Sequence, residues 1–415
     1  MHALRVRAYN VRFGDAILVS VPDTDEGGTT TTRHILFDVG NALSSAGGHD
    51  DVFEPIVADV LNELDGSPLD LYVSTHEHLD HVQGLFYASH EHGLDLDISR
   101  IWMTASAENG YYERPGHEEA KKRNKKLTET LRGIADGLPL TLRTEPSIDF
   151  LLLNNGIVPD ALAASNPTRS TKKCVDFLKE HPGEHSYVSR RNGPKRIASW
   201  PHPCDELWIE VWAPEEDTSS YHGRFTPNAF AAVGASGLAS GARSSELVPP
   251  PGVDAGAFYD LIRHRQNGFY DNLLAIDKAN NNTSVVVCLE WRGWRLLFPG
   301  DAEQRSWKEM SKRKNVLKPV HFLKMGHHGS HNATPDGDIF DTILPAASHD
   351  GRQRVALVST ADEPYPSVPD EEPSGAMARI KNRVDHLCDT RDIAPGKSYN
   401  ISFPADGSAP MLATT

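Results

Sequence analysis

The chain has 415 residues, of which 39% are hydrophobic and 24% are charged, so a largely disordered chain is excluded. Its 42 Lys and Arg residues stand against 57 Asp and Glu residues, and the formal charge of −15 argues against binding to nucleic acid through a general positive field. No apolar run approaches the roughly 18 residues that span a bilayer, and the four cysteines never form a Cys-x-x-Cys pair. The sequence therefore predicts a soluble, cytoplasmic protein with no membrane partner, no disulfide framework and no cysteine-rich zinc site.

The first quarter of the chain predicts a layered α/β core. Residues 4–9 and 16–21 have the alternating or apolar pattern of strands, and a third strand is expected at 35–37. Apolar residues at helical spacing predict a helix over 52–64, and a short buried strand follows at 69–74. Strand, helix and strand in this order are typical of layered α/β folds.

The middle of the chain is irregular, and 100–275 is interpreted mostly as an insertion. A charged helix is expected over 116–137. Residues 206–213 alternate again, which predicts a return to the core sheet. The stretch 228–256 is dominated by Ala, Gly and Ser and ends in three prolines, so it is interpreted as a flexible excursion.

Strand character resumes in the last third of the chain. Strands are expected at 284–289, 294–298, 320–324 and 355–359. The whole chain, 1–415, is therefore interpreted as one domain. Its core would consist of 1–100, about 206–213, and 276–403.

The most informative segment is THEHLDH at 75–81, directly after an apolar strand. Side chains two residues apart on an extended backbone point the same way, so His76 and His78 can hold one cation together. If the chain then turns into a helix, Asp80 and His81 reach a second cation beside the first. Imidazole and carboxylate ligands without thiolate suit Zn, Mn or Fe. An exposed polar loop is the alternative, and the density of ligand-type residues argues against it.

Two later strands also end on residues that bind metals. The strand at 294–298 leads through Pro-Gly to Asp301, and the strand at 320–324 leads to His327 and His328. An aspartate between two cations can bridge them, as in paired sites whose ions lie about 3.5–4 Å apart.

These segments resemble the metallo-β-lactamase superfamily of binuclear metallohydrolases. Within it, the chain is similar to the branch that contains the hydrolase domain of the DNA-uptake competence protein ComEC and its stand-alone soluble relatives. The resemblance rests on NVRFGDAIL at 10–18, LFDVG at 36–40, THEHLDHVQGL at 75–85, NNNTS at 280–284, PGDAE at 299–303 and KMGHHGS at 324–330.

The resemblance implies an αββα sandwich, in which two mixed sheets pack face to face with helices outside. By position, it assigns His76 and His78 to one divalent ion, and the ligands Asp80, His81 and His327 to a second. Asp301 would bridge the two ions, which are expected to be Zn or Mn. Either histidine of the pair 327–328 fits as the ligand, and His328 is, with Asp80, a candidate for catalysis.

The resemblance also implies residues around the ions. Asp38 would hold the 75–81 loop by hydrogen bonds, and Asp15 is a second candidate for that role. Many members of the superfamily have a further histidine where this chain has NNNTS, so the first ion would take an oxygen of Asn281, Asp277 or water instead. Fewer nitrogen ligands keep manganese open beside zinc.

Two cations lower the pKa of a water molecule between them, so a bridging hydroxide is available near neutral pH. The branch resemblance, the charge of Lys324 and the hydroxyl of Ser330 favour a phosphodiester substrate, either a nucleic acid or a small or cyclic nucleotide. The prediction is a metal-dependent phosphodiesterase or nuclease. Two alternatives stay open: a lactonase or thioesterase-type hydrolase of a small substrate, which the acidic charge favours, and a non-catalytic metal-binding regulatory module.

Overall fold

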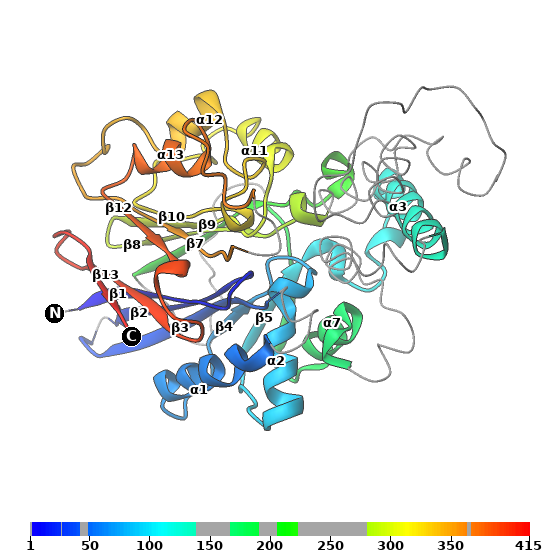
Figure 1. Ribbon diagram of the computed structural model, residues 1–415, viewed down its shortest axis with the longest axis horizontal. Helices are drawn as coiled ribbons and strands as arrows, with labels where there is room; N and C mark the ends of the chain where they lie inside the picture. The colour runs from blue at the N-terminus through cyan, green and yellow to red at the C-terminus, as the bar shows by residue number, and fades with distance from the viewer. Residues whose placement is uncertain are drawn as a thin grey trace, which may run out of the picture.

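The computed structural model describes residues 2–25, 27–41, 49–137, 167–190, 206–222, 280–362 and 367–415. They form an α/β structure in which two mixed β-sheets pack face to face, with helices on both outer sides (Figure 1). Among these residues, no helix has both the length and the hydropathy required to cross a bilayer.

The first sheet has eight strands. In spatial order they are β14 (Met411–Thr414), β13 (Ser398–Pro404), β1 (Ala3–Tyr9), β2 (Ala16–Thr24), β3 (Thr30–Val39), β4 (Leu71–Val73), β5 (Arg100–Thr104) and β6 (Glu184–Val188). Neighbours are antiparallel from β14 to β3 and parallel from β3 to β6.

The second sheet has six strands. In spatial order they are β12 (His386–Asp389), β11 (Val355–Val358), β10 (Phe322–Lys324), β9 (Trp294–Phe298), β8 (Val286–Trp291) and β7 (Leu207–Ala213). Neighbours are parallel from β12 to β9 and antiparallel from β9 to β7. The carboxyl ends of the parallel strands in one sheet therefore share an edge.

Helices cover the outer face of each sheet. The first sheet is covered by α1 (Phe53–Leu64), α2 (Leu79–His92) and α7 (Thr171–Glu180), and the second by α11 (Gln304–Ser311), α12 (Gly337–Ile343) and α13 (Ala376–Lys381). The helix α3 (Glu118–Gly137) lies away from the two sheets in Figure 1.

The alternation of side chains along the strands separates three apolar cores. Ile35 and Phe37 of β3 face the second sheet, where Phe37 stacks on Phe298 of β9 with ring centroids 4.3 Å apart. Leu36, one residue earlier, faces the opposite way and packs with α1 and α2. The strands β2, β3 and β9 are therefore largely buried on both faces, as expected for strands that read as nearly continuous apolar runs.

Several predicted elements are confirmed with small shifts of their ends. The helix expected over 52–64 is α1, and the segment 206–213 returns to a core sheet as β7. The range 100–275 contributes β5, α7 and β6 to the first sheet and its cover. The stretch 228–256 and Asp277 lie outside the described residues. Cys174, Cys288 and Cys388 are buried free thiols.

Candidate metal centre

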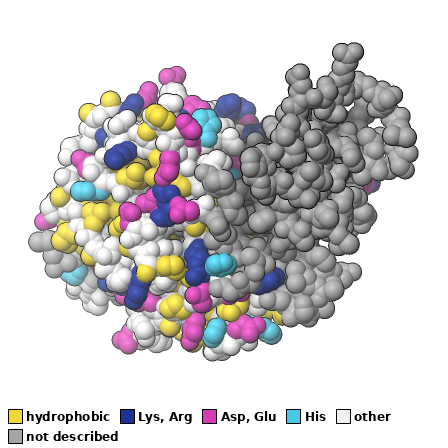
Figure 2. Space-filling model, viewed as in Figure 1, with side chains coloured by type: hydrophobic (Ala, Val, Ile, Leu, Met, Phe, Trp, Pro, Cys, Tyr) yellow, Lys and Arg dark blue, Asp and Glu magenta, His cyan; other side chains and the backbone are white. Residues whose placement is uncertain are grey.

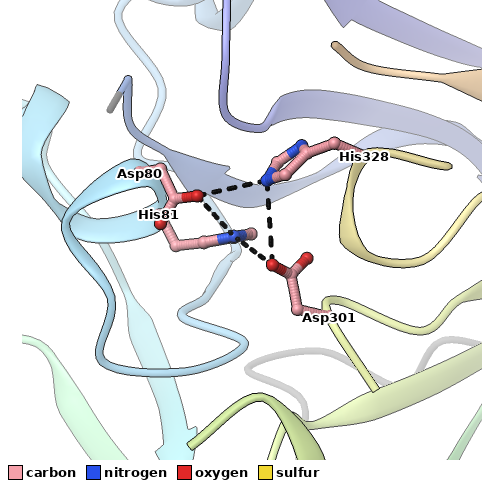
Figure 3. Close-up of side chains that lie close together, drawn as sticks. All are labelled: Asp80, His81, Asp301 and His328. Carbon is pink, nitrogen blue, oxygen red and sulfur yellow. Dashed lines mark hydrogen bonds and ion pairs between the residues drawn. The ribbon is translucent and has the colours of Figure 1, made fainter. Parts of the chain in front are cut away.

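Three strands deliver polar side chains to one place. The chain leaves β4 at Val73 and begins α2 at Leu79, and the intervening loop with the first turn of α2 carries the histidines and Asp80. Asp301 follows β9, and His328 follows β10 in a short 3-10 turn. In Figure 3 the side chains of Asp80, His81, Asp301 and His328 point towards one another.

These four residues form a compact buried group. Each side chain has one ligand-type atom, and these atoms all lie within 4.8 Å of one another. His328 Nε2 lies 3.1 Å from Asp80 Oδ2 and 3.7 Å from Asp301 Oδ2. His81 Nε2 lies 3.3 Å from Asp301 Oδ2 and 3.8 Å from Asp80 Oδ2. No member is more than 1% exposed.

The outer nitrogens of the two imidazoles are bound to acceptors, and this fixes their tautomers. His81 Nδ1 lies 2.8 Å from Asp38 Oδ2, and His328 Nδ1 lies 2.8 Å from the carbonyl oxygen of Ser359. Both Nδ1 atoms therefore carry a proton, and both Nε2 atoms face the carboxylates of Asp80 and Asp301. Burial lowers the pKa of His81, but the carboxylates of Asp301, Asp80 and Asp38 raise it well above its usual value, so a second proton occupies its Nε2 when no metal ion is bound there. Acceptors that face one another at such distances need a cation or a proton between them, and histidine ligands usually have such a partner on the outer nitrogen.

His76 is also oriented by a hydrogen bond at its outer nitrogen, Nδ1. The hydroxyl of Thr75 donates to Asp38 Oδ2 at 2.7 Å, so its oxygen is left to accept from His76 Nδ1 at 3.1 Å. The lone pair of His76 Nε2 then faces His78 Nδ1 at 3.1 Å and Asp301 Oδ2 at 3.8 Å. The nitrogen donors of His76 and His78 thus extend the group of four on its Asp301 side.

Asp38 makes hydrogen bonds both to the loop that carries His76 and to the imidazole of His81. Its Oδ1 accepts from the backbone N–H of Thr75 at 2.8 Å, while its Oδ2 accepts from Thr75 and His81. The carboxylate therefore fixes the loop and one imidazole together. This is the placement expected for the residue that holds the 75–81 loop.

The structure places the remaining predicted residues around the group. Lys324 is 1% exposed, and its ammonium pairs with the carboxylate of Asp15. Ser330 is buried, and its hydroxyl makes no hydrogen bond in the described part of the chain.

The two histidines at 327 and 328 lie in different surroundings. His328 belongs to the buried group of four, whereas the side chain of His327 is 20% exposed and its Nδ1 lies 3.5 Å from Glu303 Oε1. Glu303 also accepts from Asn281 Nδ2 at 3.2 Å. Asn281 thus directs its amide group to a carboxylate. Sequence reasoning missed Glu303, although it lies two residues after Asp301.

Two glycines allow the loops to approach one another. A Cβ atom at Gly40 would lie 2.1 Å from the carbonyl carbon of Asp80, and one at Gly14 would lie 2.1 Å from the carbonyl oxygen of Gly40. The turns after β1 and β3 therefore rest directly on the first turn of α2. Only glycine leaves room for these contacts.

Burial and charge shift the pKa values within the centre. Burial alone would raise the pKa of Asp301, but the imidazoles of His81 and His328 hold it well below its usual range. Burial lowers the pKa of His76 well below its usual value, and the neighbouring His81 adds to this. Asp301 is therefore an ionised carboxylate and His76 a neutral imidazole, the forms in which each binds a metal.

A second group of ligand-type residues lies elsewhere. It consists of His321, His349 and Asp350. The buried His321 precedes β10, so it lies at the opposite end of that strand from Lys324 and the loop of His328. His321 Nε2 lies 3.1 Å from both carboxylate oxygens of Asp350, and the backbone N–H of Arg295 donates to His321 Nδ1 at 3.0 Å.

Comparison with known proteins adds no relative. No protein-family model matches the chain, and no curated protein matches its sequence.

Proposed function

We propose that the protein is a binuclear metal-dependent hydrolase with the αββα sandwich of the metallo-β-lactamase superfamily. The observation that supports this most strongly is the buried arrangement in which the Nε2 atoms of His76, His81 and His328 face the carboxylates of Asp80 and Asp301. The order of helix, sheet, sheet and helix supports the fold assignment.

The donor set suits two divalent ions, Zn or Mn. His76 and His78 would hold one ion and His81, Asp80 and His328 the other, with Asp301 between them. When bound, two such ions lower the pKa of a water molecule and polarise the bond under attack. The chain's part is to hold the Nδ1 protons of His81 and His328 on outer acceptors, Asp38 and the carbonyl group of Ser359, so that Nε2 is the atom each imidazole presents to an ion.

The substrate that we propose is a phosphodiester. The resemblance to the competence-type branch supports it, as do polar groups beside the centre. The imidazole of His327 is partly exposed on the loop that carries His328, and Ser330 lies on the same loop. Imidazole and hydroxyl groups can donate to phosphate oxygens.

The surface charge favours a small phosphodiester, such as a cyclic nucleotide or a dinucleotide, over a long duplex. Basic side chains gather on α3 and again just after α11. On α3, Lys121, Arg123 and Lys125 pair with Glu113, Glu119 and Glu129. After α11, Lys312 and Arg313 pair with Glu309 and Glu215. On the face shown in Figure 2, Lys and Arg side chains lie among Asp and Glu. Paired cations offer little to a polyanion, because counterion release needs unneutralised positive charge.

The acidic net charge is also compatible with a second candidate function. A lactone or thioester of a small molecule needs no basic surface, so a net charge of −15 is compatible with a lactonase or thioesterase-type hydrolase on the same centre. Substrate assays separate the two.

The test uses the full chain loaded with Mn or Zn and a bis-aryl phosphodiester. We expect hydrolysis, and we expect His78→Ala and Asp301→Ala to abolish it, because each removes a donor of the centre. His349→Ala is the matched control and should keep the activity. If the loaded wild type were inert on phosphodiesters but opened a lactone or cleaved a thioester, the substrate assignment would be wrong. Failure to bind either metal would overturn the whole proposal.

A further inference from the structure

Lys324 occupies an unusual place for a lysine. It is the last residue of β10 and only 1% exposed, although its side chain carries a charge. Its ammonium pairs with Asp15 and also lies 3.9 Å from Asp301 Oδ1. A buried charge is tolerated only where partners compensate it, and both partners here are carboxylates.

The two oxygens of Asp301 face different surroundings. Oδ2 lies 3.3 Å from His81 Nε2, 3.7 Å from His328 Nε2 and 3.8 Å from His76 Nε2. Oδ1 makes no hydrogen bond within the described chain, and the ammonium of Lys324 lies 3.9 Å from it. Oδ2 therefore faces His76, which we assign to one ion, and also His81 and His328, which we assign to the other.

Asp15 fixes Lys324 in this position. The backbone N–H of Asp15 donates to the carbonyl oxygen of Asp80 at 3.2 Å, and its own carbonyl group accepts from Gly40 N–H at 3.0 Å. The carboxylate that holds Lys324 is thus tied to the loops of the centre. Asp15, Asp38 and His81 also have ligand-type atoms within 4.8 Å of one another, and the ammonium of Lys324 pairs with Asp15 of this group.

We propose that Lys324 is a positioning residue, which holds Asp301 so that Oδ2 alone lies between the two ions. The inference rests on the binuclear centre of the proposed function. With an ammonium beside Oδ1, rotating that oxygen towards the ions would separate opposite charges in a low-dielectric interior, which is unfavourable. Without the ammonium, Asp301 could bind one ion through both oxygens or join the ions through a longer three-atom bridge.

The experiment measures how two Mn²⁺ ions interact, so it does not depend on activity. Replacing Lys324 alone would leave Asp15 as an unpaired buried charge, whereas removing both charges of a buried pair is often tolerated. The double variant Lys324→Met with Asp15→Asn therefore tests whether the ammonium of Lys324 orients the carboxylate of Asp301. Its matched control is Lys318→Met with Glu210→Gln, since that pair also joins a lysine to a carboxylate, with 2.7 Å between Lys318 Nζ and Glu210 Oε1, and neither residue belongs to the centre.

We expect electron paramagnetic resonance of the wild type and of the control pair, each with two equivalents of Mn²⁺, to show a spin-coupled pair. The double variant at Lys324 and Asp15 should bind two equivalents and lose most of the coupled signal. Lys324→Arg, which keeps the charge, should retain it.

Three results would overturn the inference. An unchanged coupled spectrum in the double variant would show that Lys324 does not orient Asp301. Loss of the coupled signal in Lys324→Arg to the same extent would show that the shape of the side chain, and not its charge, matters. A wild type without two coupled ions would instead remove the proposed function itself, so the two failures are distinguishable.

Discussion

Two groups of histidine and aspartate lie at opposite ends of β10, and they differ in the partner of the outer nitrogen. In the candidate metal centre, His81 and His328 donate their Nδ1 protons to Asp38 and to a backbone carbonyl, so Nε2 is the atom that each presents to the centre. At the other end, His321 accepts a backbone N–H at Nδ1.

That difference decides which group suits a metal. A neutral imidazole that accepts at Nδ1 carries its proton at Nε2, so His321 donates towards Asp350 and has no lone pair to offer there. Binding a metal at His321 Nε2 would require either loss of the bond from Arg295 or an anionic imidazolate. Ligand-type atoms that lie close together are therefore not sufficient to indicate a metal site. The partner of the outer nitrogen of each imidazole decides whether the inner nitrogen can bind a metal or only donate a hydrogen bond.

The largest expected effect follows from removing one imidazole of each group. His81→Ala should lose one of two bound equivalents of metal and about 10³-fold or more in hydrolytic rate, since it removes a donor. His349→Ala should change neither, because His321 in the same group presents a protonated Nε2 to Asp350. Metal analysis after dialysis, together with the phosphodiester assay, measures both. If His349→Ala lost an equivalent, the distinction drawn from the tautomers would be wrong.

A smaller effect is expected from the carboxylates that hold the imidazoles. Asp38→Asn keeps the shape but weakens the acceptor of His81 Nδ1, so metal affinity should fall by about 10–100-fold. Asp350→Asn is the matched change in the other group and should leave affinity within about two-fold, since no ion depends on it. Competition against a chromophoric chelator gives both values. Equal losses in the two variants would contradict the comparison.

The smallest effect concerns stability and pH. Burial lowers the pKa of His321 to about 4, against an ordinary value of about 6.5. The unfolded chain therefore binds this proton more tightly, and the stability that neutral His321 contributes is full above pH 6.5 and is lost as the pH falls towards 4. Asp350, with a pKa of about 2, stays ionised through this window.

Between pH 7.5 and 4.5, the wild type should lose about 2–3 kcal/mol more of its free energy of unfolding than His321→Gln. Urea denaturation in the presence of a chelator measures the difference without a contribution from bound metal. Parallel pH profiles for the two proteins would show that His321 is not the group that titrates.

Much of the fold could be predicted from local patterns. The alternating run of β1 and the helical spacing of α1 are visible in the sequence because one face of each meets an apolar core, and the apolar runs of β2 and β9 are visible because both of their faces do. β6 was harder to predict, since its pattern EHSYV contains no apolar run and its place in the sheet depends on pairing with β5. β14 is an exposed edge strand beyond the predicted end of the core, so no burial pattern marks it.

The segments that form the candidate metal centre could be predicted from residue types and their spacing. Strand ends followed by His and Asp indicated which segments would meet. The choice between His327 and His328 could not be made, because it depends on left-handed backbone angles, with φ of 45° and 54°, that turn neighbouring side chains apart. The partner of His328 is a backbone carbonyl at Ser359, and any residue could supply it.

The contact of Gly14, Gly40 and the first turn of α2 has a consequence for how such a protein can diversify. These segments touch through main-chain atoms, so a single added methyl group at either glycine would overlap its neighbour. The inner wall of the centre is consequently closed to gradual change, one substitution at a time. New specificities would have to arise in segments that do not make these main-chain contacts.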